Sequence, residues 1–371
     1  MNARLSPLEV FRSEGVPHRR IEAWKYSDLH AIVGPDEVAG AGAAHWHLDD
    51  LPPGVELAVL GPGEPPVWAT ERLRDLVLHG AMDAAARAFA GKGVALRVPR
   101  DLAVESPIRL AWRGHGHAQI ILVVEHGASV TVSETHHTSE GGLRNVAFSA
   151  FVADGARLTH VRQAARAPSL ASVETISVDV QGNGRYGVHL VELGARLSRV
   201  EFDVLLAGEG AQAEFSGAIA VDDGGHVDVT THVDHAIGRT RSVQLFKAVA
   251  AGKSRAVYQG RITVREGANG SDSRQTAKAL LLNDRAEADL KPELEIFADD
   301  VKCAHGAAVG DLDADSLFYL RSRGVPEAEA RSLLVRAFLE EPMMQIEHDD
   351  IRNALGAFLE GGLKDMAEAQ P

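Results

Sequence analysis

The segment Asp154-Gly155-Ala156-Arg157-Leu158 sets the pattern for the central part of the chain. It joins a small-residue turn to a run that alternates apolar and polar side chains, as β-strands do. The same Gly-Ala turn recurs at His126-Gly127-Ala128-Ser129-Val130, Leu193-Gly194-Ala195-Arg196-Leu197 and Glu209-Gly210-Ala211-Gln212-Ala213. We therefore predict that residues 93–310 form a β region built from many short strands.

Repeated turns of this kind are compatible with a β-sandwich, an antiparallel barrel or a β-solenoid. The four glycines are separated by 28, 39 and 16 residues. This irregular spacing argues against a left-handed helix of strict hexapeptide repeats. It leaves an irregular right-handed solenoid and a sandwich open, because periodicity alone does not choose between them.

The regions on either side of the β region are predicted to be helical. In residues 1–92, Ser6 and Glu9 have the spacing of a capping box before a first short helix. In residues 311–371, Asp313 or Asp315 is placed to cap a helix that Gly324 ends. The chain is thus divided into an N-terminal mostly helical region, a β core and a C-terminal helical domain.

The C-terminal domain is predicted to carry two more amphipathic helices. One begins at Pro326 and has a single apolar stripe made by Ala330, Leu333, Leu334, Ala337 and Phe338. The next has Ile351, Leu355, Phe358 and Leu359 on one face and is predicted to end at Gly361-Gly362. Three short helices bury little among themselves, so their stripes are expected to pack on the β core or on another protein.

Composition limits the possible functions. Of 371 residues, 45% are hydrophobic, which is enough for a substantial core, and the formal net charge of -14 speaks against nucleic-acid binding. The N-terminus lacks the apolar run of a signal peptide, and no stretch approaches the roughly 20 apolar residues of a membrane span. We therefore expect a cytoplasmic protein without a membrane span.

Several patterns that could carry chemistry are weak on inspection. His226 and His232 share one face of a predicted strand but lie roughly 20 Å apart, too far to chelate one ion. We interpret that face as solvated and His235, on the opposite face, as a hydrogen-bonded core residue. His136 and His137 point to opposite faces, and a surface or turn position is predicted for them.

Common catalytic motifs are absent from the sequence. It contains no Gly-x-Ser-x-Gly elbow and no phosphate-binding loop with Gly-Lys-Ser/Thr. Hydrolase and nucleotide-binding interpretations therefore lack support.

The segment 290–310 concentrates reactive side chains. Cys303, the single cysteine, and His305 point the same way on a strand and offer donors suited to iron. One cysteine excludes an intrachain disulfide and an all-cysteine metal site, so any further ligands would come from elsewhere. Asp299 and Asp300 point to opposite faces, which weakens an acid-base role. Chemistry alone favours a structural cysteine and a hydrogen-bonded histidine.

The sequence also carries motifs that resemble those of the SufB/SufD family of the Suf iron–sulfur cluster assembly system, and of its SufD branch more than its SufB branch. They are Arg20-Ile21-Glu22-Ala23-Trp24-Lys25-Tyr26-Ser27-Asp28-Leu29, Tyr258-Gln259-Gly260-Arg261-Ile262, Gln275, Leu280-Leu281-Leu282, Lys291-Pro292, Ala298-Asp299-Asp300-Val301-Lys302-Cys303-Ala304-His305-Gly306-Ala307 and Leu317-Phe318-Tyr319-Leu320-Arg321-Ser322-Arg323-Gly324. They span nearly the whole chain, and those in the C-terminal half are the most specific.

This resemblance implies a right-handed parallel β-helix with helical flanks, which selects the solenoid over the sandwich. It also implies a scaffold subunit that is not an enzyme and that pairs with a SufB-like subunit through the end of the β-helix. A SufC-like ABC ATPase would bind the C-terminal helices, which would explain the stripe from Ala330 to Phe338. A homodimer is a further expectation for the isolated chain.

The resemblance also assigns roles at the predicted site. His305 matches the family's interface histidine, which works with a cysteine of SufB on the nascent cluster, and Cys303 is a secondary candidate. The transient iron–sulfur cluster would be shared with the SufB partner, and none would be held stably by this chain alone. Mixed Cys and His ligand sets of this kind are known for iron–sulfur clusters.

Two other functions compete with this one. The first is a β-helix lyase or hydrolase acting on carbohydrate, with Asp299, Asp300 and Lys302 as acid and base groups. Such enzymes use aromatic-lined grooves, whereas aromatic residues make up 5% of this sequence. The second is an interaction module without a direct metal role.

Overall fold

The computed structural model describes residues 5–61, 66–75, 77–137, 141–346 and 348–368. Their strands form two nine-stranded sheets. The first sheet holds, in spatial order, β1 (Trp46–Leu48), β4 (Ile108–Trp112), β6 (Ser129–His136), β8 (Arg157–Ala164), β10 (Arg185–Glu192), β12 (Gln212–Val221), β14 (Arg241–Ala250), β16 (Ser271–Leu281) and β18 (Val301–Gly310). The second holds β2 (Glu56–Leu60), β3 (Gly93–Val98), β5 (Gly116–Val124), β7 (Gly142–Val152), β9 (Ala167–Val180), β11 (Ala195–Leu206), β13 (His226–His235), β15 (Arg255–Val264) and β17 (Glu287–Ile296).

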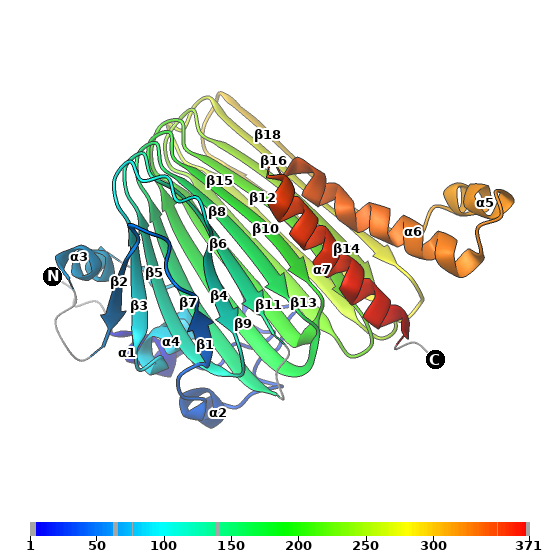
Figure 1. Cartoon of the computed structure of the whole chain (residues 1–371), viewed down its shortest axis with the longest axis horizontal. Helices are drawn as coiled ribbons and strands as arrows, with labels where there is room; N and C mark the ends of the chain where they lie inside the picture. The colour runs from blue at the N-terminus through cyan, green and yellow to red at the C-terminus, as the bar shows by residue number, and fades with distance from the viewer. Residues whose placement is uncertain (1–4, 62–65, 76, 138–140, 347, 369–371) are drawn as a thin grey trace.

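From β3 onward, successive strands alternate between the two sheets, and each pairs in parallel with the strand one turn away. The chain therefore winds as a parallel β-solenoid, as Figure 1 shows. The predicted solenoid is confirmed, and the sandwich is excluded because, from β3 onward, the described strands pair with the strand one turn away and not with the next strand in sequence. Antiparallel pairing occurs at one end, between β1 and β4 and between β2 and β3.

One rim of the solenoid repeats more regularly than the Gly-Ala turns indicate. Positive φ angles recur there at Gly127, Gly155, Asn183 and Gly210, at intervals of 28, 28 and 27 residues. The backbone N–H of each of the first three donates to the carbonyl just before the next, so the turns stack in a ladder. Gly194 lies at the opposite rim, between β10 and β11, which is why the motif looked irregular in the sequence.

The interior between the sheets is filled by apolar side chains. Alternate residues of each strand point inward, and Val, Ile, Leu and Phe dominate the buried cluster that runs along the solenoid. The tight turns place small residues in the corners, where Ala128, Ala156 and Ala211 are fully buried. Burial of this continuous core is the main stabilising contribution to the fold.

Helices flank both sheets. They are α1 (Pro7–Glu14), the 3-10 turn η1 (Glu22–Trp24), α2 (Pro35–Gly40), α3 (Val67–Asp75), α4 (Gly80–Phe89), α5 (Ala314–Ser322), α6 (Glu327–Glu340), the 3-10 turn η2 (Glu341–Gln345) and α7 (Asp349–Glu368). The capping box at Ser6 and Glu9 is present, with a distance of 2.7 Å from Ser6 N to Glu9 Oε2. The N-terminal region also supplies β1 and β2, which extend the two sheets.

The two helical groups cover opposite faces. Helix α4 packs on β5, β7 and β9 of the second sheet, whereas α6 and α7 lie across β8, β10, β12 and β14 of the first (Figure 1). Helix α7 buries Leu355 and Leu359, as predicted, but its predicted end at Gly361-Gly362 is wrong, because the helix continues to Glu368. A side chain at Gly362 would collide with Leu193, so this glycine permits close approach of helix and sheet.

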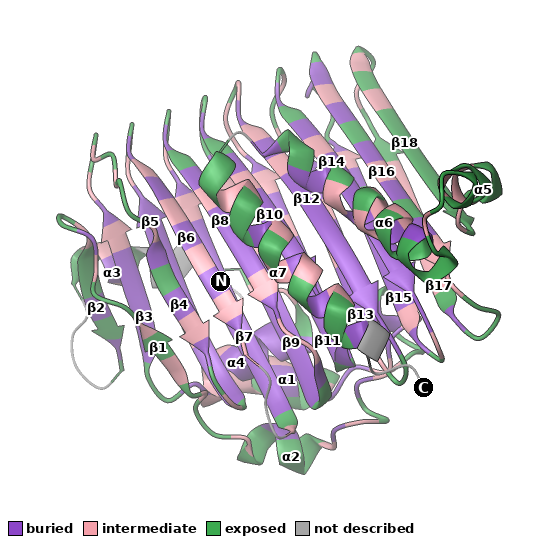
Figure 2. Cartoon of the chain, turned by 45° about the vertical axis from the view of Figure 1, so that its right-hand side comes forward, coloured by how far each residue is buried: buried purple, intermediate pink, exposed green. Residues whose placement is uncertain are grey.

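Helix α5 stands apart from the rest of the molecule. Asp313 caps it through a 2.8 Å hydrogen bond from the backbone N–H of Ser316, and Gly324 follows it with φ +89°. None of its residues is buried, and Figure 2 shows it as an exposed element beyond the end of α6. Among the described residues, no helix is both long enough and apolar enough to cross a bilayer.

Candidate functional site

The predicted site lies on β18, the last strand of the solenoid. In the register of β16 and β18, Cys303 lies opposite Ser273 and His305 opposite Gln275. Ser273 and Gln275 point into the interior, so Cys303 and His305 are on the same inward side, as predicted. Because no described turn follows β18, His305 is exposed while Cys303 is half-buried.

A buried polar layer lies directly beneath these two residues. The hydroxyl of Thr231 donates to Gln244 Oε1 at 2.7 Å, and the hydroxyl of Tyr258 donates to the same atom at 3.0 Å. Gln275 is buried below His305, and its amide makes no hydrogen bond to any described residue. Gly260 keeps this layer open, because a side chain there would collide with Gln275 and Tyr258.

The environment of Cys303 keeps it a thiol. Partial burial raises the pKa of Cys303, while a hydrogen bond from the backbone of Ser273 opposes this shift and Asp272 adds to it. The thiolate is the form that binds iron. A metal at this position would therefore have to displace the proton.

The residues of the competing enzyme hypothesis lie on the surface. Asp299 and Asp300 occupy the turn between β17 and β18, and Lys302 is exposed on β18. Asp300 serves the turn through its backbone, since its carbonyl accepts a 2.6 Å hydrogen bond from Gly270 N–H. Both carboxylates are exposed to solvent in this turn.

The last turn leaves two long strand edges open. Within the described residues, β17 pairs with β15 alone and β18 with β16 alone, and each has ten residues. Apolar side chains are exposed beside these edges, namely Ile296, Phe297 and Val309. Unpaired edges with apolar surface are sites for adding strands from another chain.

Comparison with known proteins now places the chain. A family model described as SUF system FeS cluster assembly, SufBD core domain, matches residues 112–338, more than half of the sequence. The chain belongs to the SufBD family. It is therefore an iron–sulfur cluster assembly protein of that family.

Individual relatives support this assignment over the full length. An iron–sulfur cluster assembly SufBD family protein of Mycobacterium tuberculosis is 31% identical, covering 94% of this chain and 90% of the relative. The iron–sulfur cluster assembly protein SufD of Escherichia coli is 28% identical, covering 96% and 92%. A SufBD family protein of Synechocystis is 27% identical, covering 93% and 87%.

The N-terminal family motif clamps the outer face of the second sheet. The ring of Trp24 stacks on the guanidinium of Arg199, whose carbon lies 4.1 Å from the ring centroid. Ser27 donates a 2.5 Å hydrogen bond to Asp228, and Arg199 pairs with the same carboxylate. Lys291, on β17, bonds Glu22 at 3.1 Å. Motifs distant in sequence therefore meet beside the last turns.

This clamp corrects the prediction for the strand 226–235. The face of His226 and Asp228 was predicted to be solvated, but the N-terminal segment covers it and Asp228 is fully buried. Burial lowers the pKa of His226 to about 4. His235 is confirmed as a hydrogen-bonded core residue, 2.8 Å from Thr240 Oγ1 and 2.9 Å from Ser242 Oγ.

The surface position predicted for His136 is wrong. His136 points into the solenoid and is buried, together with Glu134 and Glu174. Among the described residues, these three form a group whose ligand atoms are close enough to hold a metal ion. Opposite faces for His136 and His137 argue against a chelate made by these two residues, but they do not argue against burial of His136 alone.

The five residues predicted to form one apolar stripe on α6 lie in different environments. Ala330 is buried, and Leu334 and Phe338 are partly buried, with Lys247 Nζ 4.2 Å above the Phe338 ring. Leu333 and Ala337 point outward and are exposed. The inward face is completed by Val335 and Leu339, which pack on the first sheet and which the prediction omitted. The five predicted residues therefore do not form one outward surface.

Proposed function

We propose that this chain is the SufD-like subunit of an assembly complex and that it pairs with a SufB-like subunit through the open end of its solenoid. The observation that carries the proposal is that the exposed His305 lies on β18, which together with β17 forms a pair of ten-residue edge strands without a described outer neighbour. Edge pairing with another solenoid would continue both sheets and cover Phe297 and Val309. His305 would then lie inside the joint interface.

His305 and Cys303 would contribute to a nascent cluster whose remaining ligands come from the partner. Imidazole and thiolate both bind iron, and mixed sets occur in iron–sulfur proteins. Within the described residues these two side chains belong to no group of three metal-binding residues. A shared site therefore explains the chemistry better than a cluster held by this chain alone. The chain would act as a scaffold and catalyse no reaction itself.

The C-terminal helices would bind a SufC-like ATPase. Helix α5 carries the exposed aromatic residues Phe318 and Tyr319, within a motif that resembles the family. Leu333, on α6, adds exposed apolar surface. These residues are available to a partner, whereas Ala330 and Phe338 already pack within the chain.

The histidine role is tested by co-expressing a His305→Ala chain with SufB-like and SufC-like partners. We expect a complex that assembles normally but contains much less iron, because a ligand is removed while no fold contact is lost. His47→Ala is the matched control, since His47 is an exposed histidine on β1 at the opposite end. An intact His305→Ala complex that contains as much iron as the wild-type complex would contradict the proposed role of His305 as a ligand.

The ATPase surface is tested with Phe318→Asp. We expect loss of ATPase capture with an unchanged melting temperature, because Phe318 is 74% exposed. Met344→Asp, at an equally exposed position on η2, is the control and should capture normally. Phe338→Asp should lower the melting temperature, since that ring packs on the sheet. Retained capture by Phe318→Asp would place the ATPase elsewhere.

A homodimer through the same end remains the alternative assembly. Light scattering of the isolated chain, with and without the SufB-like partner, distinguishes the two. The proposal predicts that the partner displaces any homodimer. A homodimer that persists in the presence of excess partner would favour the interaction module without a metal role.

A further inference from the structure

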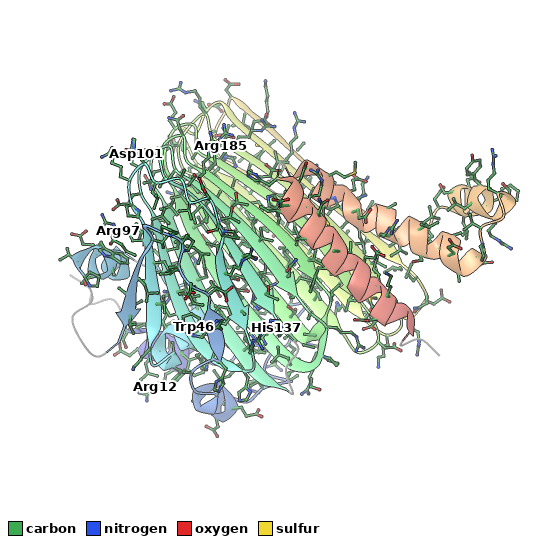
Figure 3. The ribbon with its side chains drawn as sticks, viewed as in Figure 1. Arg12, Trp46, Arg97, Asp101, His137 and Arg185 are labelled. Atoms are coloured by element: carbon green, nitrogen blue, oxygen red, sulfur yellow. The ribbon has the colours of Figure 1, made fainter. Side chains whose placement is uncertain are left out.

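One charged cluster interrupts the apolar interior of the solenoid. It lies toward the carboxyl ends of β6, β8 and β10, and its members come from both sheets: Glu134, His136, Arg144, His160, Arg162, Glu174 and Glu192. All are nearly or fully buried. Figure 3 labels His137, which directly follows His136 and marks this rim, while Arg185 and Asp101 mark the opposite one. The proposed function gives this cluster no role.

Three of these side chains converge on one point. His136 Nε2 lies 3.4 Å from Glu134 Oε2 and 3.7 Å from Glu174 Oε2, and ligand atoms of all three residues lie within 4.8 Å of one another. Ligands held about 2.0–2.2 Å from a tetrahedral metal ion are about 3.3–3.6 Å apart. The observed separations are long for hydrogen bonds and close to those of metal ligands.

A fourth donor points at the same oxygen. His160 is fully buried, and its Nε2 makes no hydrogen bond but lies 3.5 Å from Glu134 Oε2. Its Nδ1 is 3.2 Å from the hydroxyl of Tyr186. With the proton on Nδ1 bonded to Tyr186, Nε2 presents a lone pair to the cluster, as metal-binding histidines do.

The charges of the cluster are not balanced. Arg162 pairs with Glu174, at 2.5 Å from Nε to Oε2, and with Glu192. Arg144 donates to the carbonyls of Gly114 and His137, each at 3.0 Å. Glu134 therefore forms no close ion pair with an arginine or lysine among the described residues, although its carboxyl group interacts with Trp112 and Glu174 and, at longer range, with Arg162. A buried carboxylate needs a compensating positive charge.

We propose that Glu134, His136 and Glu174 bind one divalent transition-metal ion inside the solenoid, with His160 as the fourth donor. Two carboxylates and imidazole form a set suited to Zn²⁺, Fe²⁺ or Mn²⁺. Arg162 bonds Glu174 Oε2, the same oxygen that lies 3.7 Å from His136 Nε2, and so fixes the orientation of this carboxylate. The ion would neutralise Glu134 and join the two sheets across the core. This site is separate from His305 and does not depend on the proposed partner complex.

A small cavity adjoins the cluster, lined by His136, Arg162 and Glu192 and by the small residues Gly194 and Ala195 of the rim. It has room for about one water molecule, so an ion that enters here must shed its hydration shell. The rest of its lining is Arg144 of the same cluster together with Ala164, Ala165, Ala167, Leu170, Ser172 and Ser198.

The test uses the full chain without an affinity tag, stripped with a chelator and then incubated separately with Zn²⁺, Fe²⁺ under anaerobic conditions, or Mn²⁺. After gel filtration we expect about one ion per chain for at least one metal, with a raised melting temperature. Glu134→Gln and His136→Gln should each weaken binding at least tenfold. Glu192→Gln is the matched control, because it alters a carboxylate of the same cluster outside the ligand set, and His305→Ala controls for the end site.

Three results would overturn the proposal. They are no metal retained by the wild-type chain, unchanged affinity in Glu134→Gln and His136→Gln, or loss of the metal in His305→Ala. The first would mean that a proton neutralises Glu134. Should the variants fail to fold, the absorption spectrum of Co²⁺ added to the wild-type chain decides. Bands of a four-coordinate nitrogen and oxygen site support the proposal, and the spectrum of hydrated cobalt contradicts it.

Discussion

The two ends of the solenoid are built differently. At the N-terminal end, the outer strands are β1, with three residues, and β2, with five, and both pair antiparallel with their neighbours. At the C-terminal end, β17 and β18 each have ten residues and continue the parallel sheets without a described neighbour. The N-terminal end closes the sheets with short antiparallel strands, whereas the C-terminal end presents long strand edges on which further strands can pair.

This difference indicates where a partner binds. Short edge strands are one device by which proteins prevent unwanted pairing of sheet edges, and edge charges and prolines are others. The C-terminal end has long edge strands with the exposed Phe297 and Val309 near them, and Lys291 and Pro292 of β17 are its main protective residues. A long exposed edge is an aggregation risk unless a partner covers it. These features support the proposal that a partner solenoid pairs with this end of the chain.

The largest expected effect is a difference in the free energy of unfolding between substitutions near the two ends. Trp112, on β4, is fully buried, so Trp112→Ala should lower the free energy of unfolding by about 3–5 kcal/mol. Phe297→Ala, at a residue 65% exposed, should change it by less than about 0.5 kcal/mol. Urea denaturation of the isolated chain measures both. Equal losses would show that the C-terminal end is packed within the chain itself.

The second prediction concerns capture of the partner. Phe297→Glu combined with Val309→Lys should weaken binding of the SufB-like subunit at least 100-fold, about 2.7 kcal/mol, because charges would enter an apolar interface. Leu57→Lys with Val59→Lys is the control, since Leu57 matches Val309 with 47% exposure but lies on β2. Titration calorimetry gives both affinities. If the Leu57→Lys and Val59→Lys pair alone weakened binding of the SufB-like subunit, the partner would bind the N-terminal end and the proposal would be contradicted.

The third prediction is a pH dependence near the open end. Burial lowers the pKa of His235 to about 4, against 6.5 for the free side chain. A depressed folded pKa means that stability is fully present above pH 6.5 and falls as the pH drops toward 4. We expect His235 to contribute a loss of about 1–3 kcal/mol over this range. Thermal melts of the wild type and His235→Gln should show a flatter profile for the variant, and parallel profiles would contradict this.

The smallest expected effect tests the competing acid-base residues. Asp299→Asn and Lys302→Ala should change stability by less than about 0.5 kcal/mol, because both side chains are exposed. Iron content of the co-purified complex should also stay at the wild-type level. A large loss of iron in either variant would extend the functional site beyond Cys303 and His305.

The solenoid could be predicted in outline, though its repeat could not be read from glycines alone. The turn position requires a positive φ, which Gly127 and Gly155 supply easily, but Asn183 and Arg239 occupy it in other turns. A search for glycine alone therefore misses turns of the repeat. It also includes Gly194, which lies at the opposite rim and does not belong to the same series of turns. Helix caps such as Ser6 and Asp313 were predictable because they depend on neighbouring residues.

The placement of candidate site residues was also predictable where it depends on local strand geometry, and not predictable where it depends on contacts between distant segments. The common direction of Cys303 and His305 follows from strand alternation, a local property. The burial of His136 and Asp228 depends on which face another segment covers, which alternation does not specify. A usable signal existed, since Glu134 and Arg162 are 28 residues apart and occupy paired positions in adjacent turns. Opposite charges at one inward repeat position indicate a buried charged cluster, in which Arg162 pairs with Glu174 and Glu192.

The most direct test of the open end is hydrogen exchange of the chain alone and with the SufB-like partner. Our account predicts that binding slows exchange in residues 287–296 and 301–310, the two edge strands, while residues 46–48 and 56–60 at the other end exchange as before. Protection at the N-terminal end, or binding without protection of β17 and β18, would contradict it.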